Sequence, residues 1–139
     1  MMSHPAILKL GLEPGNLVLE VGRDSDCDES FRTALESHLG VALIDSNTDE
    51  VVDAVLLWWR DGDGDLTDAL VDVLTFLSEN GPIWLMSPKV GKIGYVEAGD
   101  IQDAAPSAGL SPTTGFKVSE DWIATKLVAR KASKTSKSK

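Results

Sequence analysis

The stretch DAVLLWWRDGDGDLTDALVDVL, residues 53–74, places a continuous apolar run before an acidic, glycine-containing turn and a helical pattern. The run 53–59 is apolar on both faces, which predicts a strand at the centre of a sheet. The segment after the turn repeats apolar residues at helical spacing and reaches a stop signal at Asn80-Gly81. The apolar positions of this predicted helix are Leu66, Leu70, Val73 and Leu77. A strand followed by a helix in this way is typical of an α/β domain.

The flanking sequence continues the alternation of strands and helices. In chain order it predicts a short helix at 4–12, strands at 17–21 and 41–45 separated by a helix at 29–39, a strand at 83–87, a proline-disturbed helix at 100–110, and an antiparallel hairpin of 114–119 with 122–130. We therefore expect a single α/β domain over residues 1–131, with a mostly parallel sheet flanked by helices and an antiparallel hairpin at its C-terminal edge. Residues 132–139 are expected to form a basic flexible tail.

The charge distribution argues against a nucleic-acid-binding body. The formal net charge is -9, and five of the 13 basic residues lie from Arg130 onward, so the first 129 residues carry eight basic against all 22 acidic side chains. Such a body repels phosphates. Contact with nucleic acid is therefore expected only through the tail, whose Lys/Ser composition is more typical of a solvated terminus.

Several features predict a cytoplasmic protein without a membrane segment. No apolar run approaches the roughly 20 residues that a membrane helix needs, and the start MMSHPAILKLG lacks the basic and apolar regions of a secretory signal. The single cysteine, Cys27, cannot form an internal disulfide, which fits a reducing compartment.

The acidic turn has the spacing of a calcium loop. Asp61, Asp63 and Asp65 match its first, third and fifth places, and Asp72 falls at the twelfth. However, Leu66 stands where such a loop needs a glycine, and the segment before the turn is strand-like rather than helical.

A simple strand-to-helix corner explains the same residues. Asp65 is a suitable N-cap for a helix that begins at Leu66, with Asp68 at the third helical position. Lys89 and Lys92, on the loop after the next strand, could neutralise the acids without a metal. We favour the corner and keep divalent-cation binding by Asp61, Asp63 and Asp65 as an alternative.

The segment LEPGNLVLEVG, residues 12–22, resembles the entry to the S-adenosylmethionine-dependent methyltransferase fold, in which a strand ends in an acid and a glycine-rich turn. Glu20 and Gly22 match that pattern, and Asp45 closes the next predicted strand where such enzymes hold a ribose. Asp24 and Asp26 stand where further glycines should let the backbone approach a cofactor. The chain also lacks one strand-helix unit of the full fold, so the resemblance implies a degenerate adenosyl or nucleotide site at Glu20, Gly22 and Asp45.

We assign no catalytic residue. Cys27 lies among acids that raise a thiol pKa and suppress its nucleophilicity. His4 and His38 have no Asp and Ser arrangement that would predict a hydrolase triad. The four tryptophans lie on predicted strands, where core packing is the default, although Trp59 or Trp84 could floor a pocket. We therefore expect a protein that is not an enzyme and needs no cofactor.

Four segments resemble one family across nearly the whole chain. They are VVDAVLLWWRDGDGDLTDALVDVL, GPIWLMSPK, AAPSAGL and TKLVARK, at residues 51–74, 81–89, 104–110 and 125–131. The family is a group of small actinobacterial proteins, domain of unknown function 3052. This resemblance implies a Rossmann-like α/β fold and carries over no catalytic residue.

The sequence thus favours a non-catalytic binding or regulatory protein that acts through contacts with an unidentified protein partner. The alternatives are the degenerate adenosyl-binding domain and the calcium-binding loop. Homo-oligomerisation stays open.

Overall fold

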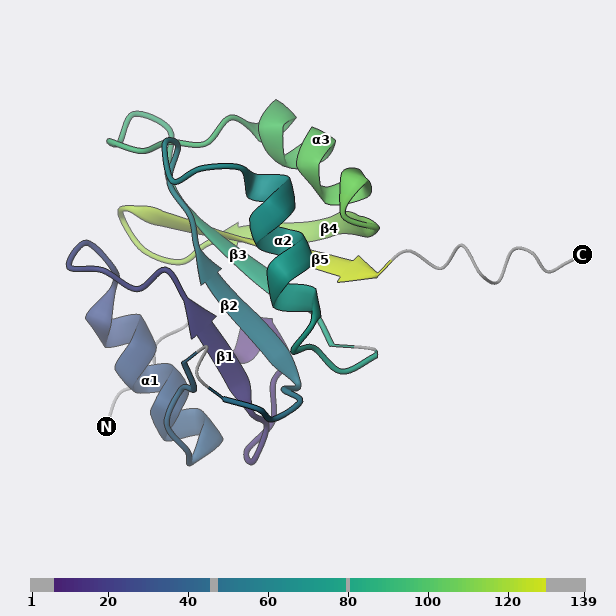
Figure 1. Cartoon of the computed structure of the whole chain (residues 1–139). Coiled ribbons are helices and arrows are strands. Elements are labelled where there is room, and N and C mark those ends of the chain that lie inside the picture. The colour runs from purple at the N-terminus through teal and green to yellow at the C-terminus, as the bar shows by residue number, and fades with distance from the viewer. Residues whose placement is uncertain (1–6, 46–47, 80, 130–139) are drawn as a thin grey trace, which may run out of the picture.

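The apolar run at 53–59 forms β2 (Ala54–Trp58), which is buried along its full length and lies between two parallel neighbours. These neighbours are β1 (Val18–Val21) and β3 (Ile83–Pro88). The computed structural model describes residues 7–45, 48–79 and 81–129. Its sheet has the order β1-β2-β3-β5-β4, in which β5 (Trp122–Ala129) is antiparallel to β3 and to β4 (Leu110–Lys117) (Figure 1). This confirms the predicted α/β fold with a parallel core and a C-terminal antiparallel hairpin.

Helices cover both faces of the sheet. The helix α1 (Glu29–Leu39) and the short 3-10 helix η1 (Ile7–Leu10) pack on one face, and α2 (Leu66–Leu74) and α3 (Ala98–Ser107) pack on the other. Because successive strand residues point to opposite faces, β2 supplies Leu56 and Trp58 to the α1 side and Val55 and Leu57 to the α2 side. Two hydrophobic cores result.

The predicted helix starts are confirmed by their caps. The carboxylate of Asp28 accepts a hydrogen bond from the backbone N–H of Phe31 (3.1 Å), and that of Asp65 accepts one from Asp68 (3.1 Å). Each cap satisfies a backbone donor that the helix leaves open and stabilises the fold by about 1 kcal/mol. Gly40 ends α1 in the left-handed conformation, directly after the predicted end of this helix at residue 39.

Two predicted elements are shorter than expected. The segment 41–45 is not a strand, because only Ile44 pairs with β1, through a bridge to Leu19, while the N–H of Leu43 donates to the Glu36 carboxylate (2.9 Å). The second helix ends at Leu74 rather than 79. Beyond it the chain turns to pair with Val52, whose N–H donates to the Phe76 carbonyl (2.8 Å).

The N-terminal helix predicted at 4–12 is observed only as the four-residue 3-10 helix η1, because the chain turns at Gly11. Residues 4–6, His4 included, lie outside the described residues, as does the predicted tail at 132–139. The segment after η1 is held to α1, because the His38 ring donates from Nε2 to the Leu12 carbonyl (2.6 Å). The four tryptophans are buried, which confirms their prediction as core residues. Among the described residues, no helix is long and apolar enough to cross a membrane.

Four loops gather at the end of the sheet where the parallel strands β1, β2 and β3 terminate. The three parallel strands end side by side, and β5 begins beside the end of β3, where Trp122 pairs with Pro88. The segments 22–28, 59–65 and 89–97 therefore meet the hairpin turn 118–121 at this edge. In open α/β sheets, ligands bind beyond the carboxyl ends of the strands, which is this end of the sheet.

Candidate functional site at the switch point of the sheet

The switch point of the sheet lies between β1 and β2. After β1 the chain passes through α1 to Ile44 on one side of β1, whereas β2 lies on the other side. A cavity of about 320 Å³ opens there. Its lining comes from the ends of both strands, the loops that follow them and one residue of α2: residues 21–24, 57–60, Asp63 and Ala69. This is the place where α/β proteins of this topology bind a ligand.

Gly22 brings the two strand ends close together. Its φ of +85° lies in the left-handed region, and a Cβ added to it would approach the Trp58 carbonyl oxygen to 2.3 Å. The backbone conformation at position 22 and its contact with β2 are therefore enough to require glycine there, without any ligand.

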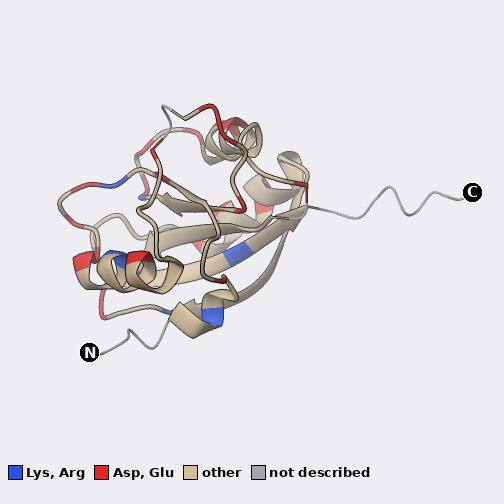
Figure 2. Cartoon of the chain, turned by 90° about the horizontal axis from the view of Figure 1, so that it is seen from below, with Lys and Arg blue, Asp and Glu red and all other residues tan. Residues whose placement is uncertain are grey.

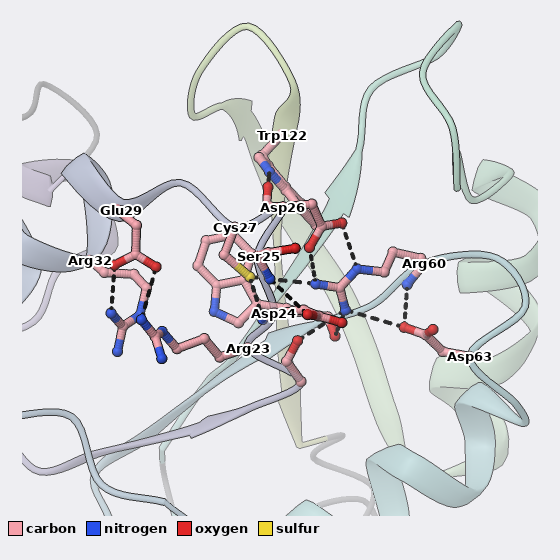
Figure 3. Close-up of polar contacts among 12 residues, drawn as sticks. Arg23, Asp24, Ser25, Asp26, Cys27, Glu29, Arg32, Arg60, Asp63 and Trp122 are labelled. Atoms are coloured by element: carbon pink, nitrogen blue, oxygen red, sulfur yellow. Dashed lines mark hydrogen bonds and ion pairs between the residues drawn. The ribbon is translucent and has the colours of Figure 1, made fainter.

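Arg60 extends from the end of β2 across this crevice (Figure 3). Its guanidinium donates to both carboxylate oxygens of Asp26, from Nη2 (2.6 Å) and from Nε (2.9 Å). Nη1 donates to the Gly22 carbonyl (3.0 Å) and to the Asp63 carboxylate (3.3 Å). A single cation thus joins the loop after β1 to the loop after β2.

Neighbouring groups fix the Arg60–Asp26 pair. The guanidinium lies 5.4 Å from the centroid of the Trp122 ring, and the indole N–H of Trp122 donates to the Asp26 carbonyl (3.0 Å). The hydrogen bonds from Arg60 hold the pKa of Asp26 below its ordinary value, and Asp26 in turn raises the pKa of Arg60. Both groups are therefore charged at neutral pH.

Glu20 belongs to a second ion pair on the α1 side of the sheet. Its carboxylate accepts two hydrogen bonds from Arg32, from Nε (2.5 Å) and Nη2 (2.7 Å), and one from the indole N–H of Trp58 (2.9 Å). The side chains of Glu20 and Arg32 are only 7% and 13% exposed. Glu20 is not among the residues that line the crevice. In this structure it links β1 to α1 and to β2.

The three residues predicted to hold an adenosyl group therefore lie in three different surroundings. Gly22 lines the crevice, Glu20 is paired beneath it, and Asp45 is an exposed residue after the Ile44 bridge on the far side of β1 from β2. Their role toward a ligand stays a prediction.

The three aspartates of the acidic turn also have different surroundings. Asp65 caps α2, and Asp63 accepts hydrogen bonds from the backbone N–H (2.9 Å) and the guanidinium of Arg60. The backbone N–H of Asp61 donates to the Gly94 carbonyl (2.9 Å). Within the described part of the chain, no group of three or more His, Cys, Asp or Glu side chains is arranged to hold a metal ion. Calcium binding by these aspartates stays a prediction.

Lys92, one of the two lysines predicted to neutralise this turn, does not pair with its aspartates. Lys92 pairs instead with Asp121 (3.0 Å), and Arg60 pairs with Asp63. Arg60 and Arg32 were both missed at the sequence level. A signal existed for the position of Arg60, which directly follows the strand predicted at 53–59, at the end of the sheet where ligands bind. Its pairing with Asp26 had no signal in the sequence.

Cys27 is a buried thiol beside Arg60. Its Sγ accepts a hydrogen bond from the Asp24 N–H (3.3 Å) and lies 3.4 Å from Nη2 of Arg60. Burial raises the pKa of Cys27. The hydrogen bond from the Asp24 N–H and the charge of Arg60 offset part of this rise, and the charges of Asp26 and Glu20 add to it. The predicted direction is confirmed, with burial as the larger cause, and the thiolate form is disfavoured.

Solved methyltransferase structures share this fold at low sequence identity. A SAM-dependent methyltransferase from Aquifex aeolicus aligns with a TM-score of 0.63 and 13% identity, covering 91% of this chain and 88% of that one. A ribosomal protein L11 methylase from Lactobacillus delbrueckii subsp. bulgaricus aligns with a TM-score of 0.57 and 17% identity, covering 91% and 76%. These likenesses establish a methyltransferase-like Rossmann fold and nothing about activity.

Sequence comparison finds relatives in mycobacteria. The chain is 48% identical over 124 residues to the Mycobacterium tuberculosis (strain H37Rv) protein named "Uncharacterized protein Rv2239c", covering 89% of this chain and 78% of the relative. A Mycobacterium bovis protein, "Uncharacterized protein Mb2263c", matches equally well. The model of the family "Protein of unknown function (DUF3052)" matches residues 7–131, and the chain therefore belongs to that family.

Proposed function

We propose that this protein is a non-catalytic binding protein, which acts through contacts with a partner protein and uses a methyltransferase-like fold as its scaffold. The observation that carries the proposal is the position of Arg60. Its guanidinium occupies the switch-point crevice and bonds to groups on both walls, Asp26 and Gly22 on one side and Asp63 on the other.

The environment of Glu20, the acid that matches the methyltransferase-fold pattern, supports the same proposal. Glu20 is nearly buried, and its carboxylate is saturated by the Arg32 guanidinium and the Trp58 indole. Releasing it to serve a ligand would leave the mostly buried guanidinium of Arg32 with only the exposed Glu29 as a charge partner, which would destabilise the fold. The acid that a cofactor would need is therefore committed to the stability of the fold.

Calorimetry with S-adenosylmethionine and S-adenosylhomocysteine tests the proposal. We expect no saturable heat from the wild-type chain at ligand concentrations up to about 1 mM, which corresponds to binding weaker than about -4 kcal/mol. Saturable binding accompanied by methyl transfer to any acceptor would overturn it.

A second candidate function is a reduced ligand-binding domain that holds an adenosyl or nucleotide group. The cavity of about 320 Å³ that remains beside Gly22 and Arg60 favours it. Wild-type binding of S-adenosylhomocysteine that weakens at least tenfold in Asp45→Ala would favour this candidate over the first. Asp72→Ala is a suitable control, since Asp72 is an exposed acid on α2 that does not line the cavity.

A further inference from the structure

A second cavity lies at the same edge of the sheet, between the loop after β3 and the β4–β5 hairpin turn. It has a volume of about 490 Å³. Its lining is Asp26, Pro88, Gly91, Lys92, Ile93, Asp121 and Trp122. Apart from the charged groups at its rim, the walls are therefore a proline, an isoleucine and an indole.

Two of the six large apolar side chains that are exposed in the described part of the chain lie on the loop beside this cavity. Ile93 is 100% exposed and Val90 is 67% exposed, on the same short loop. Two large apolar side chains held in water beside an apolar cavity are a feature of surfaces that bind another molecule.

The cavity is preformed rather than created by loop motion. The N–H of Lys89 donates to the Asp121 carbonyl (2.9 Å), and the Gly94 carbonyl accepts from the Asp61 N–H (2.9 Å), so both ends of the loop are anchored. Trp122 is buried, and its ring contacts the Trp58 ring edge to face, with centroids 4.8 Å apart. A rigid wall of this kind lowers the entropic cost of binding.

The charges around the cavity select the partner. The loops that end at this edge carry exposed carboxylates in excess of cations, and Figure 2 shows acidic residues spread over the loops and helix ends of the chain. The acids of these loops and of the hairpin turn are Asp24, Asp26, Asp28, Asp61, Asp63, Asp65, Glu120 and Asp121. A second copy of this chain would bring the same negative rim against itself, whereas a basic segment complements it.

We propose that this cavity is the docking site for a basic segment of a partner protein, which inserts one large apolar side chain between Ile93 and Trp122. This inference rests on the protein-contact role proposed above and adds the surface and the chemistry of the partner. The apolar side chain is the anchor, and the surrounding basic residues increase the association rate and provide selectivity.

Fluorescence anisotropy with labelled peptides of about nine residues tests the proposal on the full chain. The probe is a Lys/Arg-rich peptide with one central Trp, and the two controls replace that Trp by Ser or the basic residues by Glu. We expect the probe to bind at least tenfold more tightly than either control. Ile93→Asp should lower the affinity at least tenfold, and Glu120→Lys should lower it about threefold and weaken its salt dependence.

Val51→Asp is the matched control, because Val51 is 65% exposed and lies before β2, at the opposite edge of the sheet. It should leave binding unchanged. If the Ser peptide bound as tightly as the probe, binding would depend on charge alone, and the proposal would be wrong. It would also be wrong if the probe did not bind. A dimer in light scattering that Ile93→Asp abolishes would identify a second copy as the occupant instead. These peptide experiments do not use S-adenosylmethionine or S-adenosylhomocysteine. Their failure can therefore be distinguished from failure of the non-catalytic assignment, which calorimetry with those two ligands tests.

Discussion

Arg60 and Asp26, 34 positions apart in the sequence, form a two-hydrogen-bond ion pair across the switch point of the sheet, with Nη2–Oδ1 and Nε–Oδ2 distances of 2.6 and 2.9 Å. The pair joins the loops after β1 and β2 and also contacts Trp122 at the start of β5. It therefore connects three strands at the edge where related folds place their ligands. The crevice at the switch point therefore contains a structural contact of the chain itself.

Arg60→Ala should destabilise the fold by about 1–2 kcal/mol. The Arg60 side chain is only 15% exposed, and its loss removes hydrogen bonds to Gly22, Asp26 and Asp63. Because Asp26 is half exposed, the ion pair itself accounts for a minor part. Urea denaturation measures the effect, and Arg23→Ala, which removes an exposed pair with Glu29, should leave the midpoint nearly unchanged.

Glu20→Gln should be more destabilising, by about 2–3 kcal/mol, because it leaves the mostly buried guanidinium of Arg32 with only the exposed Glu29 as a charge partner. The amide oxygen can still accept from the Trp58 indole, but the amide NH2 would face Nη2 of Arg32, so the loss reports on the charge together with one hydrogen bond of the pair. Glu29→Gln is the matched control: Glu29 pairs with the same arginine at 2.9 Å but is exposed. Equal midpoints for the two variants in urea would show that the buried pair has no special role.

Gly22→Ala should destabilise the chain strongly, by about 3 kcal/mol or more, because a left-handed φ and a close backbone contact act together. The new methyl group would meet the Trp58 carbonyl oxygen at 2.3 Å, so β1 and β2 must separate at their ends. Gly62→Ala is the comparison, since its φ is +100° but nothing lies within 4 Å of the added carbon. Thermal unfolding should show a much smaller effect at Gly62, of about 1 kcal/mol.

The pH dependence of the Asp26 contribution follows from its lowered pKa. The carboxyl is more acidic in the folded chain than in the unfolded chain, so its stabilisation is complete above its ordinary pKa of 3.8 and is lost as the pH falls below that value. The difference in unfolding free energy between wild type and Asp26→Asn should therefore be constant near neutral pH and shrink in acid. A difference that grows as the pH falls would mean that Arg60 does not stabilise the charged form.

The local elements were predictable because their signals are local. Apolar spacing located α1 and β2, and the caps at Asp65 and Gly40 follow from side-chain and backbone chemistry within a few residues. The ion pairs were not predictable, because Arg32 meets Glu20 and Arg60 meets Asp26 only after the strands have been ordered in the sheet. The strand predicted at 41–45 was wrong for a similar reason: apolar composition does not reveal that the Glu36 carboxylate takes the N–H of Leu43.

Calcium binding by the acidic turn can be decided by titration watched through the fluorescence of Trp59, which lies two residues before Asp61. With Asp65 occupied as a helix cap and Asp63 bonded to Arg60, we expect no saturable change at calcium concentrations below about 1 mM, the upper end of the range for extracellular calcium modules. Leu66→Gly separates the two explanations of the sequence. If the turn is a calcium loop, glycine at its sixth place should tighten binding, because the turn can then adopt the left-handed backbone that the loop requires. If the turn is a helix start, the same change removes a buried leucine from the core beneath α2 and should only destabilise the chain, by about 2–4 kcal/mol.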